Sequence, residues 1–404
     1  MSSGGGCECH TRVVYSGRCR PFVHTGSVTT EDRPDVRDFQ AAGLYDPEGE
    51  HAAERLELLE FLVDCGATLE DLEEGRDELP AVALVVSLRP GRERLTLGEL
   101  CERAELDPDL VIRIWRAAGF PDPDANARRF SEVEAEMLSM LHSAEALVDT
   151  EAILQMVRVM GSAMARVADA MLSAFVVNVA PPFDDDDDPV GLALARANVV
   201  AGSMIPLASR FLDVLLRGHM QSMRRPISAL RGGVPGYETQ DLVVGFADLV
   251  DSTALVQQLP MAELGAAMAD FESVASDVIT AGGGRLVKLI GDEVMFVAPG
   301  ADAACDIGLT LAEVVDLHPT LSAVRVALAG GEVLSRDGDF YGPTVNVAAR
   351  AVKLAPAGAL VAPQELTADL DAAASGRFRA EDLGEQALAG FDTPVHLCRV
   401  TRSA

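Results

Sequence analysis

The chain has 404 residues, of which 49% are hydrophobic, a composition typical of globular proteins rather than disordered ones. At about 150 residues per domain, this length predicts two or three domains. Asp and Glu (63) outnumber Lys and Arg (33), so the formal net charge is −30. Because such a surface repels phosphate backbones, we expect no nucleic-acid partner. A phosphate-binding site in this chain would need positive charge of its own.

The seven cysteines are too sparse for a disulfide framework, which predicts a reducing, cytoplasmic location. No apolar segment follows the first residues, so we expect no secretory signal. The most apolar long stretch, Val199–Met223, contains Arg210, Asp213 and Arg217. Each charge would cost about 2.5–3.5 kcal/mol near the bilayer centre on insertion scales, so no membrane span is expected.

Residues 1–50 mix Gly, Ser, Pro and charge without sustained periodicity, which predicts an unstructured tail. Over residues 51–225 apolar residues recur at helical spacing, so we expect an all-α domain. Thr96 with Glu99 forms a capping box, and Asp107 precedes a proline in the manner of an N-cap.

Two long helices are expected at the end of this domain, over about 150–180 and about 191–224. The first carries four methionines mostly on one face, which favours a core face over a lipid pocket. They are Met156, Met160, Met164 and Met171.

Residues 226–236 are rich in Gly and Pro and predict a linker. From 237 to 404, short apolar runs alternate with helical patterns, so this domain is α/β or α+β. Leu242–Ala247 predicts a buried strand, and two short apolar runs around 291–293 predict a hairpin. Helices are expected over about 261–280 and 301–316, and from Thr344 as N-cap.

Two carboxylates follow strands in the second domain. Asp248 ends the first apolar run, and Asp292 lies at the tip of the hairpin. Brought together, they would repel each other unless a divalent cation lay between them. The pair is therefore a candidate metal site, with two solvated loop carboxylates as the alternative.

The chain contains only two lysines, Lys288 and Lys353. Lys288 lies in an apolar run, where its compact ammonium is a point donor that Arg does not mimic; a surface lysine on an edge strand is the alternative. Asn346 and Arg350 are four residues apart and share one helix face. An amide and a guanidinium at this spacing suit hydrogen bonds to the edge of a sugar and to a phosphate. Hydrogen bonds to a neighbouring loop are the alternative.

Three segments together resemble the class III nucleotidyl cyclase domain in sequence, order and spacing. They are Phe-Ala-Asp-Leu-Val at 246–250, Lys-Leu-Ile-Gly-Asp at 288–292, and residues 339–350. The resemblance implies a ferredoxin-like βαββαβ core filling most of the chain after the linker. The expected fold class is thus α+β, with an all-α regulatory domain followed by a cyclase catalytic domain.

By this resemblance, Asp248 and Asp292 hold two Mg²⁺ or Mn²⁺ ions per site, with the Leu249 carbonyl as a further ligand. Lys288 donates a hydrogen bond to N1 of adenine, and Asp339 accepts one from the 6-amino group. The implied substrate is therefore ATP. The 3′-hydroxyl would attack the α-phosphate in line and give cyclic AMP and pyrophosphate.

The same resemblance assigns Asn346 to the ribose and Arg350 to charge on the transferring phosphoryl group. Ser252 and Thr253 offer small donors to the phosphates. The sequence departs from the family at Asp251, where Gly is usual, and we expect this charge to weaken ATP binding or raise the metal requirement.

The family builds each site from two subunits, one supplying the metal carboxylates and the other the remaining residues. This chain holds the complete set, which implies a homodimer with two sites. Two other functions stay open: a guanylate cyclase, and a catalytically dead cyclase fold that senses a nucleotide. Lys288 and Asp339 disfavour the first, because guanine reverses the order of donor and acceptor. The complete set of site residues disfavours the second.

Residues 95–140 resemble a helix-turn-helix of the MerR kind. The candidate recognition helix carries Arg113 and Arg116 against Asp107 and Asp109, so DNA binding is disfavoured.

The order of segments resembles soluble bacterial adenylate cyclases with an autoinhibitory helical domain. The resemblance implies regulation by pH and a fatty acid as a possible ligand. His142 and His219 are candidate proton sites, although each also fits an ordinary surface histidine.

Overall fold

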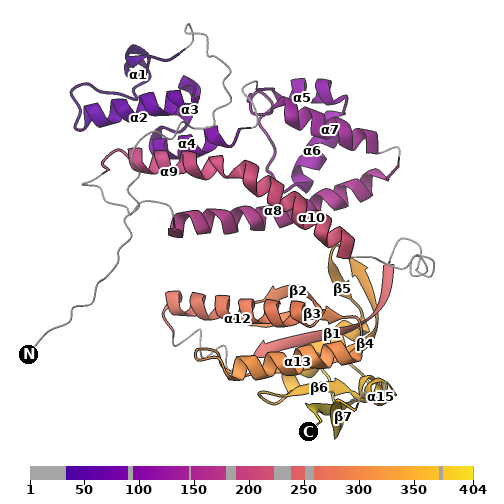
Figure 1. The fold of residues 1–404 in the computed structure, drawn as a ribbon. Coiled ribbons are helices and arrows are strands. Elements are labelled where there is room, and N and C mark those ends of the chain that lie inside the picture. The colour runs from indigo at the N-terminus through magenta and orange to yellow at the C-terminus, as the bar shows by residue number, and fades with distance from the viewer. Residues whose placement is uncertain are drawn as a thin grey trace, which may run out of the picture. The chain divides into compact units, whose positions relative to one another are not determined.

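Figure 1 shows the protein in a computed structural model. The structure describes residues 33–89, 94–144, 147–178, 188–222, 238–250, 259–372 and 376–403. The chain separates into two compact units, Met1–Met223 and Arg224–Ala404. The expected linker at 226–236 lies outside the described residues.

The described part of the first unit is helical. Its α-helices are α1 (Val36–Ala41), α2 (Ala52–Asp64), α3 (Leu69–Glu74), α4 (Leu79–Ser87), α5 (Leu97–Ala104), α6 (Pro108–Ala117), α7 (Glu132–Ala144), α8 (Thr150–Asn178), α9 (Leu192–Ser203) and α10 (Ile205–Ser222). One apolar core joins α1–α4 with α9, and a second joins α5–α7 with the start of α8. The predicted capping box of Thr96 and Glu99 and the N-cap at Asp107 are both present.

The expectation of an unstructured tail up to residue 50 was wrong for its last part. Asp35 and Asp38 form a capping box that starts α1. Phe39 and Leu44 are buried in the same core as α2. A helix of six residues is too short to show a helical repeat of apolar residues.

The last long helix is divided. α9 ends at Ser203 and α10 starts at Ile205, because Pro206 lacks an N–H and its ring clashes with the carbonyl of Gly202. The methionine face of α8 is exposed and does not form a core. Met156 and Met160 are 49% and 55% exposed.

Two helical segments, Thr150–Asn178 and Leu192–Ser222, are long and apolar enough to span a membrane, with mean hydropathies of 1.3 and 1.6. Length and composition alone are weak evidence for a span. The expected absence of a membrane span therefore stays a prediction.

In the helix-turn-helix segment, α5 and α6 lie between Leu95 and Phe130, which pair in an antiparallel β-bridge. The two arginines of α6 are already paired: Arg113 with Glu151 at 3.2 Å, and Arg116 with Asp122 at 2.6 Å. This pairing leaves little free positive charge for DNA phosphates.

The described residues of the second unit form an eight-stranded sheet in the order β2-β3-β1-β4-β6-β8-β7, with β5 paired to β4. The strands are β1 (Glu238–Leu249), β2 (Arg285–Ile290), β3 (Glu293–Ala298), β4 (Val324–Arg336), β5 (Asp339–Tyr341), β6 (Leu360–Pro363), β7 (Phe378–Gln386) and β8 (Val395–Arg402). The helices are α12 (Met261–Ala281), α13 (Ala301–Asp316), α14 (Pro343–Ala351) and α15 (Gln364–Ala372), with a short 3₁₀ helix, η3 (Val352–Leu354), directly after α14.

Strand β1 pairs antiparallel with β3 on one side and with β4 on the other. Its alternating residues pack into two cores, one with α12 and α13 and the other with α14. Gly245 is required in β1, because a Cβ there would lie 2.1 Å from the Phe296 ring. Both predicted strands of the hairpin form, and α12 and α13 occur where helices were expected.

One helix start was predicted wrongly. The N-cap of α14 is Gly342 rather than Thr344. The Thr344 hydroxyl donates instead to the carbonyl of Glu332, at 2.9 Å.

A buried carboxylate joins three parts of the first unit. The Asp71 side chain, 2% exposed, accepts hydrogen bonds from Arg89 at 2.7 and 2.8 Å and from Arg94 at 2.5 Å. It also caps α3 through the Thr68 N–H. Burial alone would raise the pKa of Asp71, but the hydrogen bonds from Arg89, Thr68 and Arg94 hold it well below its ordinary value.

We expect Asp71→Asn to lower the free energy of unfolding of the first unit by about 2–4 kcal/mol at pH 7, because two guanidinium groups lose their counter-ion. The folded-state pKa is depressed, so this stabilisation is complete above about pH 4 and is lost as the pH falls further. Urea unfolding of the wild type and of Asp71→Asn should therefore show a difference in free energy of unfolding that becomes smaller below about pH 4. Equal stability at pH 7 would contradict the assignment.

Candidate functional site

Asp248 lies near the end of the central strand β1, with its side chain 2% exposed. The antiparallel register places it directly opposite Glu293 of β3 and Arg325 of β4. Like charges directly opposite each other destabilise a strand pair. The two carboxylates therefore need compensating cations.

Two cations supply this compensation. Arg325 contacts Asp248 Oδ2 through Nε at 2.6 Å and through a terminal nitrogen at 2.5 Å. Lys353 Nζ, from η3, donates to Asp248 Oδ1 at 2.9 Å and to Glu293 Oε2 at 2.6 Å. We call these four residues the Asp248 cluster; its formal charge is zero.

Burial lowers the pKa of Lys353, but the hydrogen bonds to Glu293 and Asp248 outweigh burial. The net pKa of the Lys353 ammonium is raised above its ordinary value. Lys353 is therefore a fixed positive charge at neutral pH.

Asp292, the second predicted metal ligand, lies in the turn between β2 and β3. Its backbone carbonyl accepts a hydrogen bond from the Leu249 N–H at 3.2 Å. The fold thus brings Asp248, Leu249 and Asp292 together at one end of the central strands. Carboxylate and carbonyl oxygens are the donors that Mg²⁺ and Mn²⁺ prefer, so the residue types fit such an ion. Among the described residues, no group of three or more His, Cys, Asp or Glu side chains is arranged to hold a metal by itself.

The structure also brings Lys288 and Asp339 together. Lys288 Nζ lies 2.5 Å from Asp339 Oδ2, so β2 contributes the donor and β5 the acceptor. Asp339 Oδ1 accepts a hydrogen bond from the Phe340 N–H at 2.8 Å, and buried Phe340 anchors β5 in the core. The Arg285 guanidinium stacks on the Phe340 ring at 4.9 Å.

Asn346 and Arg350 lie on α14 and are both exposed. Within the described part of the chain, neither side chain makes a hydrogen bond or ion pair. Ser252, Thr253 and the unusual Asp251 fall outside the described residues.

Sequence reasoning missed three members of the Asp248 cluster: Glu293, Arg325 and Lys353. Arg325 and Glu293 become identifiable once β1 is paired in register with β4 and β3. Lys353 had one signal, its rarity as the second of two lysines.

Comparison with known proteins relates both units to one family. Residues 37–223 match the family model of the adenylate cyclase regulatory domain. An adenylate cyclase of Streptomyces coelicolor is 32% identical over 346 residues, covering 83% of this chain and 87% of that protein. The chain belongs to the adenylate cyclase family.

Two further similarities accompany this assignment. A pH-sensitive adenylate cyclase of Mycobacterium tuberculosis is 29% identical over 386 residues, covering 94% of this chain and 95% of that protein. The crystal structure of an adenylyl cyclase from P. aeruginosa matches 41% of this chain and 97% of its own, at 22% identity and a TM-score of 0.37. The family-model match starts at residue 37, within α1.

Proposed function

We propose that this member of the adenylate cyclase family converts ATP to cyclic AMP and pyrophosphate. The observation that carries the proposal is the contact between Lys288 and Asp339. An ammonium donor beside a carboxylate acceptor matches N1 and the 6-amino group of adenine. Guanine presents an N–H at N1 and a carbonyl at C6, so it would face the wrong partners. This contact favours ATP over GTP.

The strand order supports a ferredoxin-like catalytic core. The elements β1-α12-β2-β3-α13-β4 follow each other along the chain, and the four strands lie in the antiparallel order β2-β3-β1-β4. This is the βαββαβ pattern of that fold.

We propose that Asp248, Asp292 and the Leu249 carbonyl hold two Mg²⁺ or Mn²⁺ ions. Bound there, the ions would activate the attacking 3′-oxygen and neutralise charge on the triphosphate. The chain itself orients the base through Lys288 and Asp339. Because these two residues lie on separate strands, their two hydrogen bonds would hold the base in one orientation, and this orientation sets the direction of the ribose.

We propose that Asn346 orients the ribose and that Arg350 stabilises charge on the phosphoryl group. Both side chains are exposed and without partners in the described part of one chain. This supports a site completed by a second copy. One chain would supply the metal carboxylates, and the other would supply Asn346 and Arg350 together with Lys288 and Asp339. The assembly would be a homodimer with two equivalent sites.

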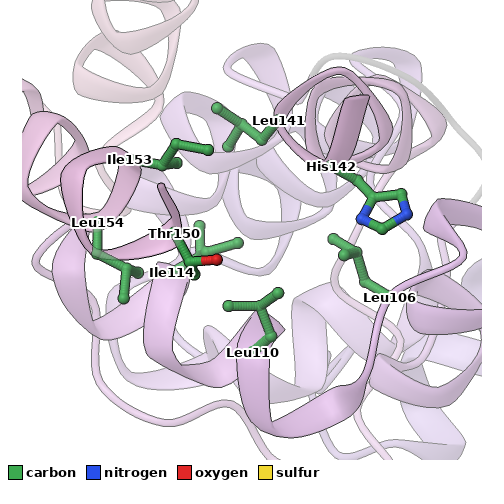
Figure 2. A pocket seen from close by; sticks show the side chains of 8 residues that line it. All are labelled: Leu106, Leu110, Ile114, Leu141, His142, Thr150, Ile153 and Leu154. Atoms are coloured by element: carbon green, nitrogen blue, oxygen red, sulfur yellow. The ribbon is translucent and has the colours of Figure 1, made fainter. Parts of the chain in front are cut away.

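We propose that the first unit inhibits the second and releases it in response to protons. The pH-sensitive relative supports this proposal. Figure 2 shows a small cavity lined by His142 and Thr150 with apolar residues of α6, α7 and α8. Its volume of about 10 Å³ is room for about one water molecule. An acyl chain would need this bundle to open, so the proton is the better-supported ligand of this region.

The proposed reaction is tested by cyclic AMP formation from ATP with Mg²⁺ or Mn²⁺, using the full-length protein. Asp292→Asn and Arg350→Ala should each lower kcat at least about 100-fold, since each removes charge stabilisation in the transition state. If the full-length protein is inactive, residues 237–404 assayed alone distinguish inhibition from a dead site. Continued inactivity of that fragment would favour the nucleotide sensor.

A mixture of the two inactive variants tests the shared site. With random assortment, half of the dimers combine one chain of each kind, and one of their two sites is intact. We therefore expect about one quarter of wild-type activity in an equimolar mixture. If each site belonged to one chain, the mixture would stay inactive.

Base recognition is tested by Lys288→Met. Losing a charged hydrogen bond to the base should lower kcat/KM for ATP by about 10- to 100-fold. The rate with GTP should change little, because guanine offers no acceptor at N1. An unchanged ratio of kcat/KM for ATP to that for GTP would contradict the assigned role.

Proton sensing is tested by replacing His142 and His219 with Gln in one protein. Because imidazoles change charge between about pH 5 and 8, the variant should respond less to pH than the wild type over this range. Residues 237–404 lack both histidines and supply the pH profile of the catalytic unit itself. A variant that keeps the full wild-type response would exclude these two residues as the sensor.

A further inference from the structure

The Asp248 cluster contains cations of two different kinds. Arg325 lies on β4, within the sheet and directly opposite Asp248, and its side chain is 27% exposed. Lys353 extends from η3, outside the sheet, and its side chain is 49% exposed. The guanidinium is therefore held by strand pairing, whereas the ammonium lies at the end of a flexible stem.

The two cations also hold different oxygens of Asp248. Both Arg325 contacts go to Oδ2, and Lys353 contacts Oδ1. A divalent ion bound to Asp248 needs a carboxylate oxygen that is free of other cations. Oδ1 is the oxygen that becomes free when only the flexible cation moves.

Lys353 keeps a partner when it leaves Asp248. Its second contact, to Glu293 Oε2, is the shorter of the two, at 2.6 Å against 2.9 Å. Rotation of the stem can thus break one ion pair and retain the other. No buried charge is left unpaired, because a metal ion would replace the ammonium at Asp248.

From these contacts we propose that Lys353 is a built-in competitor of the catalytic metal ion. It occupies Asp248 Oδ1 when no metal is bound, leaves this oxygen when a divalent ion binds, and so lowers the metal affinity of the site. The inference rests on the proposed metal-dependent function. It adds a residue that sets the metal requirement without touching the nucleotide.

The test is direct Mn²⁺ binding to the full-length protein without nucleotide, followed by electron paramagnetic resonance. Lys353→Gln should bind Mn²⁺ about 5- to 10-fold more tightly than wild type, which is the expected effect of removing one half-exposed ion pair. Lys353→Arg retains a cation that can reach Asp248 and should bind much like wild type. Melting temperatures with and without Mn²⁺ give a second readout: the ion should raise that of Lys353→Gln more than that of wild type.

Arg399→Gln is the charge-matched control. Arg399 is exposed on β8, three strands from β1 in the sheet order, so about 14 Å away at about 4.8 Å per strand. This exceeds the Debye length at physiological salt, about 8 Å. The control removes the same charge from the chain and should leave Mn²⁺ affinity within about twofold of wild type.

The outcomes separate this inference from the proposed function. Asp292→Asn should abolish Mn²⁺ binding, which assigns the binding to this site. Asp292-dependent binding that is equal or weaker in Lys353→Gln would overturn the competitor role and leave the metal site intact. Binding by neither wild type nor Lys353→Gln would overturn the metal site itself, and this inference with it.

Discussion

The charge of one buried carboxylate, Asp248, constrains how the strands and η3 pack at one end of the catalytic sheet. Asp248 is almost inaccessible, and its register partner Glu293 is a second carboxylate. Antiparallel pairing brings Arg325 to its other side, and η3 brings Lys353 above both acids. The cluster therefore depends on β3, β4 and η3 being in place at once. An error in the β1 register would move Asp248 to the opposite face and leave these cations unpaired.

The same strand pairing positions the other site residues. Once β3 lies beside β1, the hairpin turn places Asp292 next to Leu249, and β2 follows at the sheet edge with Lys288. On the other side, the last residues of β4 pair with the start of β1 and also with β5, which holds Asp339. The contact between Lys288 and Asp339 thus joins two segments that are 51 residues apart in sequence. The proposed base recognition would therefore depend on strand geometry and not on a single loop.

Local features of this fold were predictable from sequence because their causes are local. Asp248 and Asp292 follow apolar runs, and α12 and α13 have clear helical periodicity. The break between α9 and α10 also has a local cause, Pro206, but the continuous apolar pattern around it hid the division. Helix α1 was missed because six residues show little periodicity, although its capping box was readable.

The members of the Asp248 cluster could not be predicted, because they depend on pairing at long range. Lys353 is 105 residues from Asp248, and Arg325 is 77 residues from it. Local sequence patterns do not give the register in which such distant strands pair with β1.

The sequence also does not identify what covers the surfaces that one chain leaves exposed. Sequence periodicity identifies an apolar helix face but not what covers it, so the methionines of α8 were expected in a core and are exposed. Helix α10 has no buried residue in the described structure, although Phe211, Leu215 and other apolar residues repeat along it. In the catalytic unit, Asn346 and Arg350 are likewise exposed without partners among the described residues. Each unit thus leaves exposed a surface whose residue types suit burial or binding. That surface is apolar in the first unit and polar in the second. In the proposed homodimer with shared sites, the second surface would have a chemical role that a single chain does not provide.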